Sequence, residues 1–122
     1  MKLLSLAGIL VVATTLAAFR QAPVIEWRIR VESVAGDSVV AQLKYVTTFP
    51  DGRSESRRRV TPFEVHVDSP ALTCLVQAEQ RDKRLKVSIT RVVDDKVGRT
   101  AAGTYATTAC WARFDEFGVF GN

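Results

Sequence analysis

The sequence is poor in the residues that most often carry metal or nucleophilic chemistry. It has one histidine and two cysteines in 122 residues, and no serine or cysteine lies in a nucleophile-elbow pattern. His66 shares a predicted strand face with Glu64 and Asp68, but these side chains are spread over about 13 Å and do not converge on one ion. We therefore expect a non-enzymatic protein with no cofactor, no metal site and no small-molecule substrate.

Helical periodicity is also missing after residue 24, as are internal repeats and low-complexity tracts. Apolar and polar residues alternate instead, as in a half-buried antiparallel strand; Ile25, Trp27, Ile29 and Val31 share one face. Turn residues divide the rest of the chain into short strands. The predicted strands are Ile25–Glu32, Ser38–Thr48, Arg53–Val60, Phe63–Val67, Leu72–Glu79, Arg84–Val93, Val97–Ala101 and Thr104–Ala112.

Seven or eight short strands with regularly spaced turns predict an all-β fold, and we favour an immunoglobulin-like antiparallel β-sandwich over residues 24–112. Ala35–Asp37 has turn chemistry and predicts a hairpin between the first two strands. Asp94 and Asp95 are predicted at the tip of a second hairpin. Trp27 and Trp111 are assigned to core and rim packing.

An apolar run, Leu3–Phe19, lies between Lys2 and Arg20 at the start of the chain. Its seventeen residues would form a helix of roughly 25 Å, which is short for a bilayer core but within reach of local thinning. We predict a retained helix over residues 1–20 that spans the inner (cytoplasmic) membrane once, with a linker at 21–23. By the positive-inside rule, the N-terminus is cytoplasmic and the sandwich periplasmic. The alternative is a signal peptide cleaved near Ala17 or Ala18.

The two cysteines permit at most one intramolecular bridge. In an exported chain we expect a disulfide between Cys74 and Cys110, which would contribute about 4 kcal/mol on the chain-entropy model. Two free, buried thiols are the alternative.

Several short motifs resemble the MmpS family, small single-pass membrane proteins that accompany RND-type MmpL exporters. They are Val60–Phe63, similar to V-x-x-P-W; Val76–Ala78; Val93–Val97, similar to V-D-G-K-V; and Gly103 followed by Ala109–Cys110. The family's first cysteine lies in the strand leading into the hairpin, where this chain has Val87 and Ile89. The resemblance implies one extracytoplasmic β-sandwich and a larger transporter as partner.

The densest charge on the chain is the arginine strand, which contains Arg53, Arg57, Arg58 and Arg59. Repeated arginine is typical of an edge strand protected against edge-to-edge pairing. The functional alternative is contact with an anionic partner, either lipid headgroups or an acidic protein surface. Nucleic acid is not expected, because no aromatic residues alternate with the arginines to stack bases.

The C-terminal segment 113–122 is rich in aromatic residues, with Phe114, Phe117 and Phe120 spaced by three. Rings of this kind need burial. They either fold back on the sandwich or dock into a partner, and we predict a separate tail that docks. Its removal is then expected to leave the sandwich folded but free of its partner.

These features together predict an accessory subunit that is tethered to the bilayer through Leu3–Phe19 and stabilises a larger membrane protein complex. Its contact residues are the three phenylalanines of the tail and the four arginines of the arginine strand. The rival hypothesis is a cleaved, periplasmic or secreted sandwich that binds an anionic ligand.

The first prediction concerns the N-terminus. Because charges bracket the apolar run, protein extracted from membranes should have the intact mass of the whole chain, 13.5 kDa. Mass spectrometry of the purified protein checks this. A mature chain that begins at Ala18 or Phe19 would establish cleavage instead.

Overall fold

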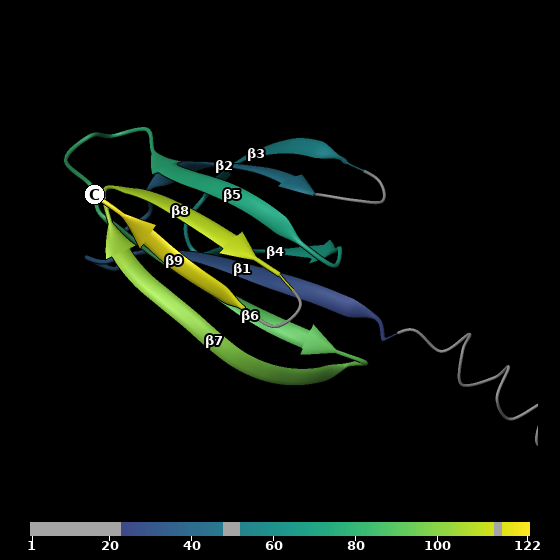
Figure 1. Ribbon diagram of the computed structural model, residues 1–122. Helices are drawn as coiled ribbons and strands as arrows, with labels where there is room; N and C mark the ends of the chain where they lie inside the picture. Colours follow the sequence, from purple (N-terminus) through teal and green to yellow (C-terminus); the bar gives the residue numbers. More distant parts are fainter. Residues whose placement is uncertain (1–22, 48–51, 114–115) are drawn as a thin grey trace, which may run out of the picture.

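The computed structural model describes residues 23–47, 52–113 and 116–122, which form nine strands in two antiparallel sheets (Figure 1). One sheet has the order β4 (Phe63–Asp68), β1 (Ile25–Ser33), β6 (Leu85–Val93), β7 (Lys96–Tyr105). The other has the order β3 (Ser54–Val60), β2 (Val40–Thr47), β5 (Leu72–Ala78), β8 (Thr107–Ala112), β9 (Phe117–Gly121). The predicted anchor, 1–20, lies outside the described residues. Within the described ranges, no helix has the length and apolar character to span a bilayer.

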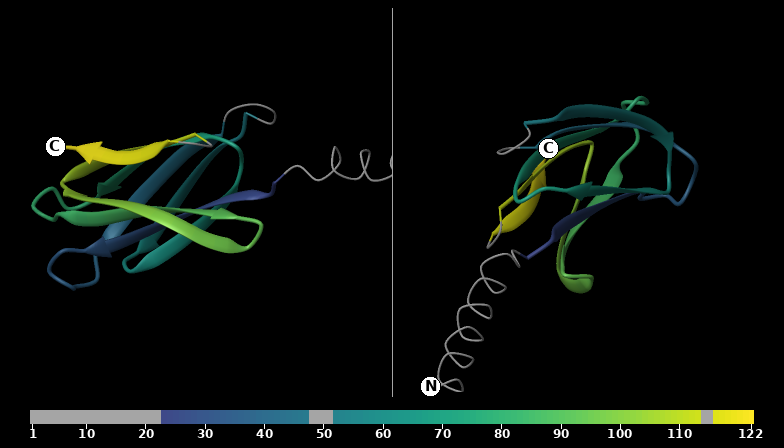
Figure 2. Two further views of the ribbon diagram at one scale, coloured as in Figure 1. Left: turned by 60° about the horizontal axis from the view of Figure 1, so that its bottom comes forward. Right: turned by 90° about the vertical axis from the view of Figure 1, so that its right-hand side faces the viewer.

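Alternation of apolar and polar residues determines which side of each strand is buried. In β1, the side chains of Trp27, Ile29 and Val31 are completely buried. The inward side chains of both sheets form one hydrophobic cluster, so the core lies between the two layers seen in Figure 2. The prediction of an all-β fold with two antiparallel sheets is confirmed.

Successive strands run in opposite directions, so the sandwich has two distinct ends. We call the end where β1 begins the leading end; it also carries Ser69–Ala71, Asp94–Asp95 and Arg113. We call the opposite end, where β1 finishes, the far end. The C-terminus lies at the far end (Figure 1), where Asn122 and Thr107 bond through their backbones.

The connection between β6 and β7 is the predicted tight hairpin. Val93 is paired with Lys96, and the two residues between them, Asp94 and Asp95, both have positive φ angles, 49° and 63°. This is the conformation of the two-residue turn that matches strand twist, and aspartate tolerates it better than most residues. The hairpin prediction is confirmed here.

The predicted hairpin between the first two strands is wrong. β1 pairs with β4 and β6, whereas β2 pairs with β3 and β5 in the other sheet. Gly36, with φ of 79°, allows the turn, but the segment that contains it crosses from one layer to the other. Alternation indicates that each strand has a buried face, but it does not select the partner strand.

The predicted single strand Thr104–Ala112 is also wrong, because the chain changes sheets within it. β7 ends at Tyr105 and β8 begins at Thr107, and the Ala106 N–H donates to the Asn122 carbonyl. Close packing at this corner requires Gly121, because a Cβ there would lie 2.2 Å from the Thr107 carbonyl oxygen. The described residues form nine strands, compared with the seven or eight predicted, and the additional strand is β9.

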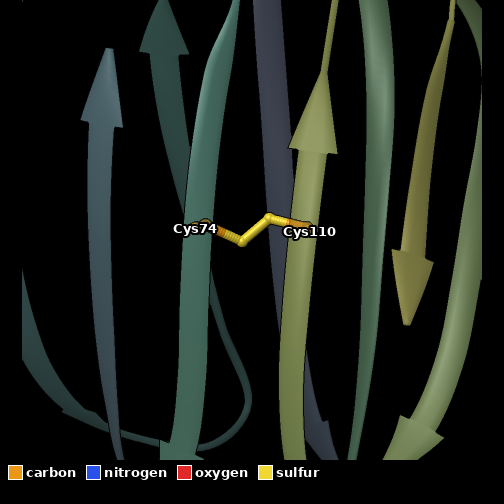
Figure 3. Close-up of a disulfide and its surroundings, with 2 residues drawn as sticks. All are labelled: Cys74 and Cys110. Atoms are coloured by element: carbon orange, nitrogen blue, oxygen red, sulfur yellow. A yellow bond between two sulfur atoms is a disulfide. The ribbon is translucent and has the colours of Figure 1, made fainter. Parts of the chain in front are cut away.

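The predicted disulfide is confirmed: Cys74 and Cys110 are bonded (Figure 3). They are directly opposite one another on the neighbouring strands β5 and β8, with Cα atoms 4.9 Å apart. Both side chains are buried. The bond therefore joins two strands within the five-stranded sheet rather than the two layers.

The predicted boundary between a sandwich at 24–112 and a tail at 113–122 is corrected, because residues 117–121 are strand β9 of the sandwich. Phe117 is only 6% exposed and belongs to the core. Its ring meets that of Trp27 edge to face at 5.2 Å, and the Arg99 guanidinium lies 4.7 Å from its centroid. At Phe117 the segment therefore folds back on the sandwich and does not extend from it. Removal of the segment is expected to destabilise the sandwich.

Replacement of Phe117 by alanine should lower the free energy of unfolding by about 3–5 kcal/mol, because the buried ring contacts core residues of both sheets. Phe120 is the matched control: its side chain is 54% exposed, and its replacement should change stability by only about 0.5 kcal/mol. Chemical denaturation of the two variants measures both values. Similar losses in the two variants would contradict the assignment of Phe117 to the core.

Candidate docking face on the five-stranded sheet

The outward side of the five-stranded sheet carries apolar residues in register across four strands. Strand pairing aligns two rows that share one surface, which we call the apolar face. The first row is Val46, Thr73, Trp111 and Gly118, and the second is Lys44, Leu75, Ala109 and Phe120. The third row, nearer the far end, is polar: Gln42, Gln77 and Thr107.

Large apolar side chains on this face are substantially exposed. The exposed fractions are 45% for Val46, 44% for Leu75 and 54% for Phe120. Single exposed apolar residues are ordinary on a protein surface, but these three come from different strands and are aligned by pairing. Together with the half-buried Trp111 they form a contiguous candidate contact surface.

Trp111 lies across the neighbouring strand β9. A Cβ added to Gly118 would lie 3.4 Å from the indole Nε1 and 3.5 Å from Cζ2, so the ring covers the glycine. A shallow cavity of about 340 Å³ adjoins it, lined by Ala71, Leu72, Thr73, Trp111, Ala112 and Arg113. An aromatic ring beside a cavity is the type of group that anchors protein contacts.

Lys44 is the charged residue within the second row. It is exposed, and no ion-pair partner for it occurs among the residues that the structure describes. Arg58, beside the third row, forms a bidentate pair with Glu79, with 3.0 Å between Nη2 and Oε2. The amino group of Lys44 is therefore a positive charge within the two apolar rows that is available to a partner.

The outward side of the four-stranded sheet has a different character. Its charges are balanced by neighbours, including Arg28 with Glu26 at 2.7 Å and Arg30 with Glu32. His66 lies 3.2 Å from Glu64 on the same side. Exposed ion pairs of this kind add little stability, but they leave a well-solvated surface. The two outer faces of the sandwich are thus chemically distinct.

The four residues of the arginine strand do not form one basic patch. By their pairing with β2, Arg57 and Arg59 lie on the core side of the edge strand, whereas Arg58 lies on the outward side. Arg53, before β3, donates from Nη2 to the Asp68 carbonyl at 3.0 Å. Arg57 is paired with Glu55 at 2.9 Å, so most of these guanidinium groups already have partners.

Glu55 connects the arginine strand to the core. Its carboxylate accepts a hydrogen bond from the hydroxyl of the buried Tyr45. The same carboxylate forms an ion pair with Arg57. The Tyr45 hydrogen bond lowers the pKa of Glu55, and the positive charges of Arg57 and Arg53 lower it further. Burial, followed by this hydrogen bond, raises the pKa of Tyr45. Charged residues on the core side of an edge strand discourage pairing with other chains, which supports the edge-protection alternative.

Among the tail residues, Phe117 is corrected from a partner contact to a core residue, because its ring is buried. Phe120 does lie on the apolar face. Phe114 lies outside the described residues. Val46, Leu75 and Lys44 are candidate contact residues that were not predicted from the sequence. The available signal was that Val46 and Leu75 are apolar at positions where the alternation requires a polar residue.

His66, Glu64 and Asp68 all lie on the outward side of β4, as their spacing predicts. His66 also approaches Glu26 of β1, with 3.6 Å between Nδ1 and Oε1. In the described part of the chain, no group of three His, Cys, Asp or Glu side chains is arranged to hold a metal ion.

Comparison with known proteins gives no assignment: no protein-family model matches the chain, and no curated protein matches it significantly.

The low pKa of Glu55 generates a prediction about stability. Because the folded-state pKa lies below the unfolded value near 4.5, the carboxylate stabilises the fold above that pH, and the stabilisation is lost as the pH falls through the lowered pKa. Glu55→Gln should therefore be less stable than wild type at pH 7, and the difference should shrink below pH 4.5. Urea denaturation across this pH range measures the difference.

Tyr45→Phe provides the control background, since it removes the hydrogen bond that contributes most to the lowered pKa. The effect of Glu55→Gln at pH 7 should be smaller in that background. An equal, pH-independent effect in both backgrounds would refute the role assigned to the Tyr45–Glu55 hydrogen bond.

Proposed function

We propose that this protein is a non-enzymatic accessory subunit, tethered to the inner membrane, whose periplasmic, immunoglobulin-like β-sandwich binds and stabilises a larger membrane protein complex. The observation that carries the proposal is the apolar face of the five-stranded sheet. Exposed apolar side chains that strand pairing aligns are characteristic of protein contact surfaces.

The sequence supports the tether. Leu3–Phe19 is apolar and is bracketed by Lys2 and Arg20, which favours retention in a membrane. Val24 follows directly after the short linker 21–23, so the sandwich would lie close to the bilayer surface. An exporter of the MmpL kind is a candidate host, on the resemblance of the short motifs to the MmpS family.

A released module that binds an anionic ligand through the arginine strand is less well supported. Arg57 and Arg58 both have carboxylate partners, and they lie on opposite sides of β3. An anion would therefore compete with Glu55 for Arg57 and with Glu79 for Arg58.

The proposal is tested with the full chain solubilised from its native membranes in mild detergent. Size-exclusion chromatography should show it in a stable complex with a larger membrane protein. In a matched control, a cleavable signal peptide replaces residues 1–20, and the sandwich should then leave the membrane fraction after a high-salt wash. Elution of the full chain as a monomer, or its recovery in the soluble fraction, would refute the proposal.

A further inference from the structure

We infer that the apolar face docks side-on against the extracytoplasmic part of the host, on an apolar surface that carries a carboxylate opposite Lys44. This inference rests on the proposed function and specifies which face binds and what chemistry it recognises. Its grounds are the position of the apolar rows along the strands, the direction of the strands and the sign of the exposed charge.

The apolar rows lie toward the leading end of the sandwich. Val46 is the penultimate residue of β2, and Trp111 is the penultimate residue of β8; both strands finish at the leading end. The polar row of Gln42, Gln77 and Thr107 lies farther along the same strands. In the tethered protein, the apolar rows would therefore be the part of this face nearest the membrane.

Two hydrogen bonds hold Val24 against the β6–β7 hairpin at the leading end. The Val24 N–H donates to the Asp94 carboxylate at 2.9 Å, and the Asp94 N–H donates to the Val24 carbonyl at 2.9 Å. β1 begins at the next residue, so the long axis of the strands extends from this point toward the far end. Sheet faces lie parallel to their strands. In the tethered protein, with the strands extending away from the bilayer, the apolar face would therefore point sideways, toward a neighbouring protein rather than toward lipid.

The sign of the charge favours a different protein over a second copy. None of the outward positions on the five strands is Asp or Glu, whereas Lys44 lies between Ser56 and Leu75 in the second row. In two copies packed through the apolar rows, neither row would offer a carboxylate to Lys44 of the other copy. A carboxylate on the partner would instead pair with Lys44.

The dimensions fit the central part of an interface. The second row crosses from β2 to β9 in three ladder steps, or about 14 Å. A standard interface buries about 800 Å² per partner and has an apolar centre with a polar rim. Here Leu75, Trp111 and Phe120 would form the centre, with Gln42, Gln77 and Arg58 at the rim.

Photo-crosslinking of the full chain in its native membranes tests the inference. A photoreactive phenylalanine analogue is placed at Leu75, and in a matched control at His66, which is similarly exposed on the other outer face. We expect an adduct with a different membrane protein from position 75 and at least tenfold less from position 66. The crosslinked partner peptide should be apolar and contain Asp or Glu.

Charge reversal supplies the second measurement. Lys44→Glu should reduce the yield from position 75 at least fivefold, and lysine at the partner's carboxylate should restore it. Arg84→Glu is the control, because Arg84 is exposed at the far end, away from the apolar face, and should leave the yield unchanged. Equal melting temperatures of the purified variants exclude loss of folding.

The other outcomes separate the two proposals. An adduct of twice the chain mass would identify a second copy, and an adduct with lipid would identify the bilayer; either overturns the inference. Adducts from position 66 only, or none from either position while the complex persists in detergent, would overturn the choice of face but not the accessory function. No adducts together with a monomeric protein would overturn both.

Discussion

A strand in this sandwich can bury only every second side chain, and that constraint decides what remains available for function. The inward-facing side chains form one core shared by both sheets, from Trp27 on β1 to Phe117 on β9. Function at the surface must therefore use the outward set, or the loops at the two ends. On the four-stranded sheet the outward set consists largely of charges that neutralise each other. On the five-stranded sheet it includes apolar residues aligned across neighbouring strands.

The fold class follows from alternation because burial and strand geometry have the same period. Ile29 and Leu43 are both fully buried, at positions where their own strands predict it. The pairing of strands could not be predicted in the same way. Ala35–Asp37 has turn chemistry that suits a hairpin, but the two flanking strands pair with other strands in separate sheets, and these pairings depend on contacts distant in sequence.

The candidate site was less predictable than the fold. Arg57, Arg58 and Arg59 appear as one charge cluster in the sequence, yet adjacent residues of a strand point to opposite sides. The structure also shows that two of the three guanidinium groups form ion pairs, Arg57 with Glu55 and Arg58 with Glu79. Glu79 lies 21 positions from Arg58 in the sequence. The sequence indicates the apolar face only weakly, because Leu75 is the one apolar residue at an outward position of β5. It becomes a surface only when pairing aligns Leu75 with Ala109 and Phe120.

The disulfide lies directly beneath that surface. Cys74 precedes Leu75, and Cys110 lies between Ala109 and Trp111, so the covalent bond crosses the sheet on the side opposite the exposed row. Backbone hydrogen bonds alone would let β5 and β8 separate locally as the sheet fluctuates. The bond prevents this separation at the centre of the face. The backbones of the two strands are therefore held at a fixed spacing, so a partner that docked on this face would cost less backbone entropy.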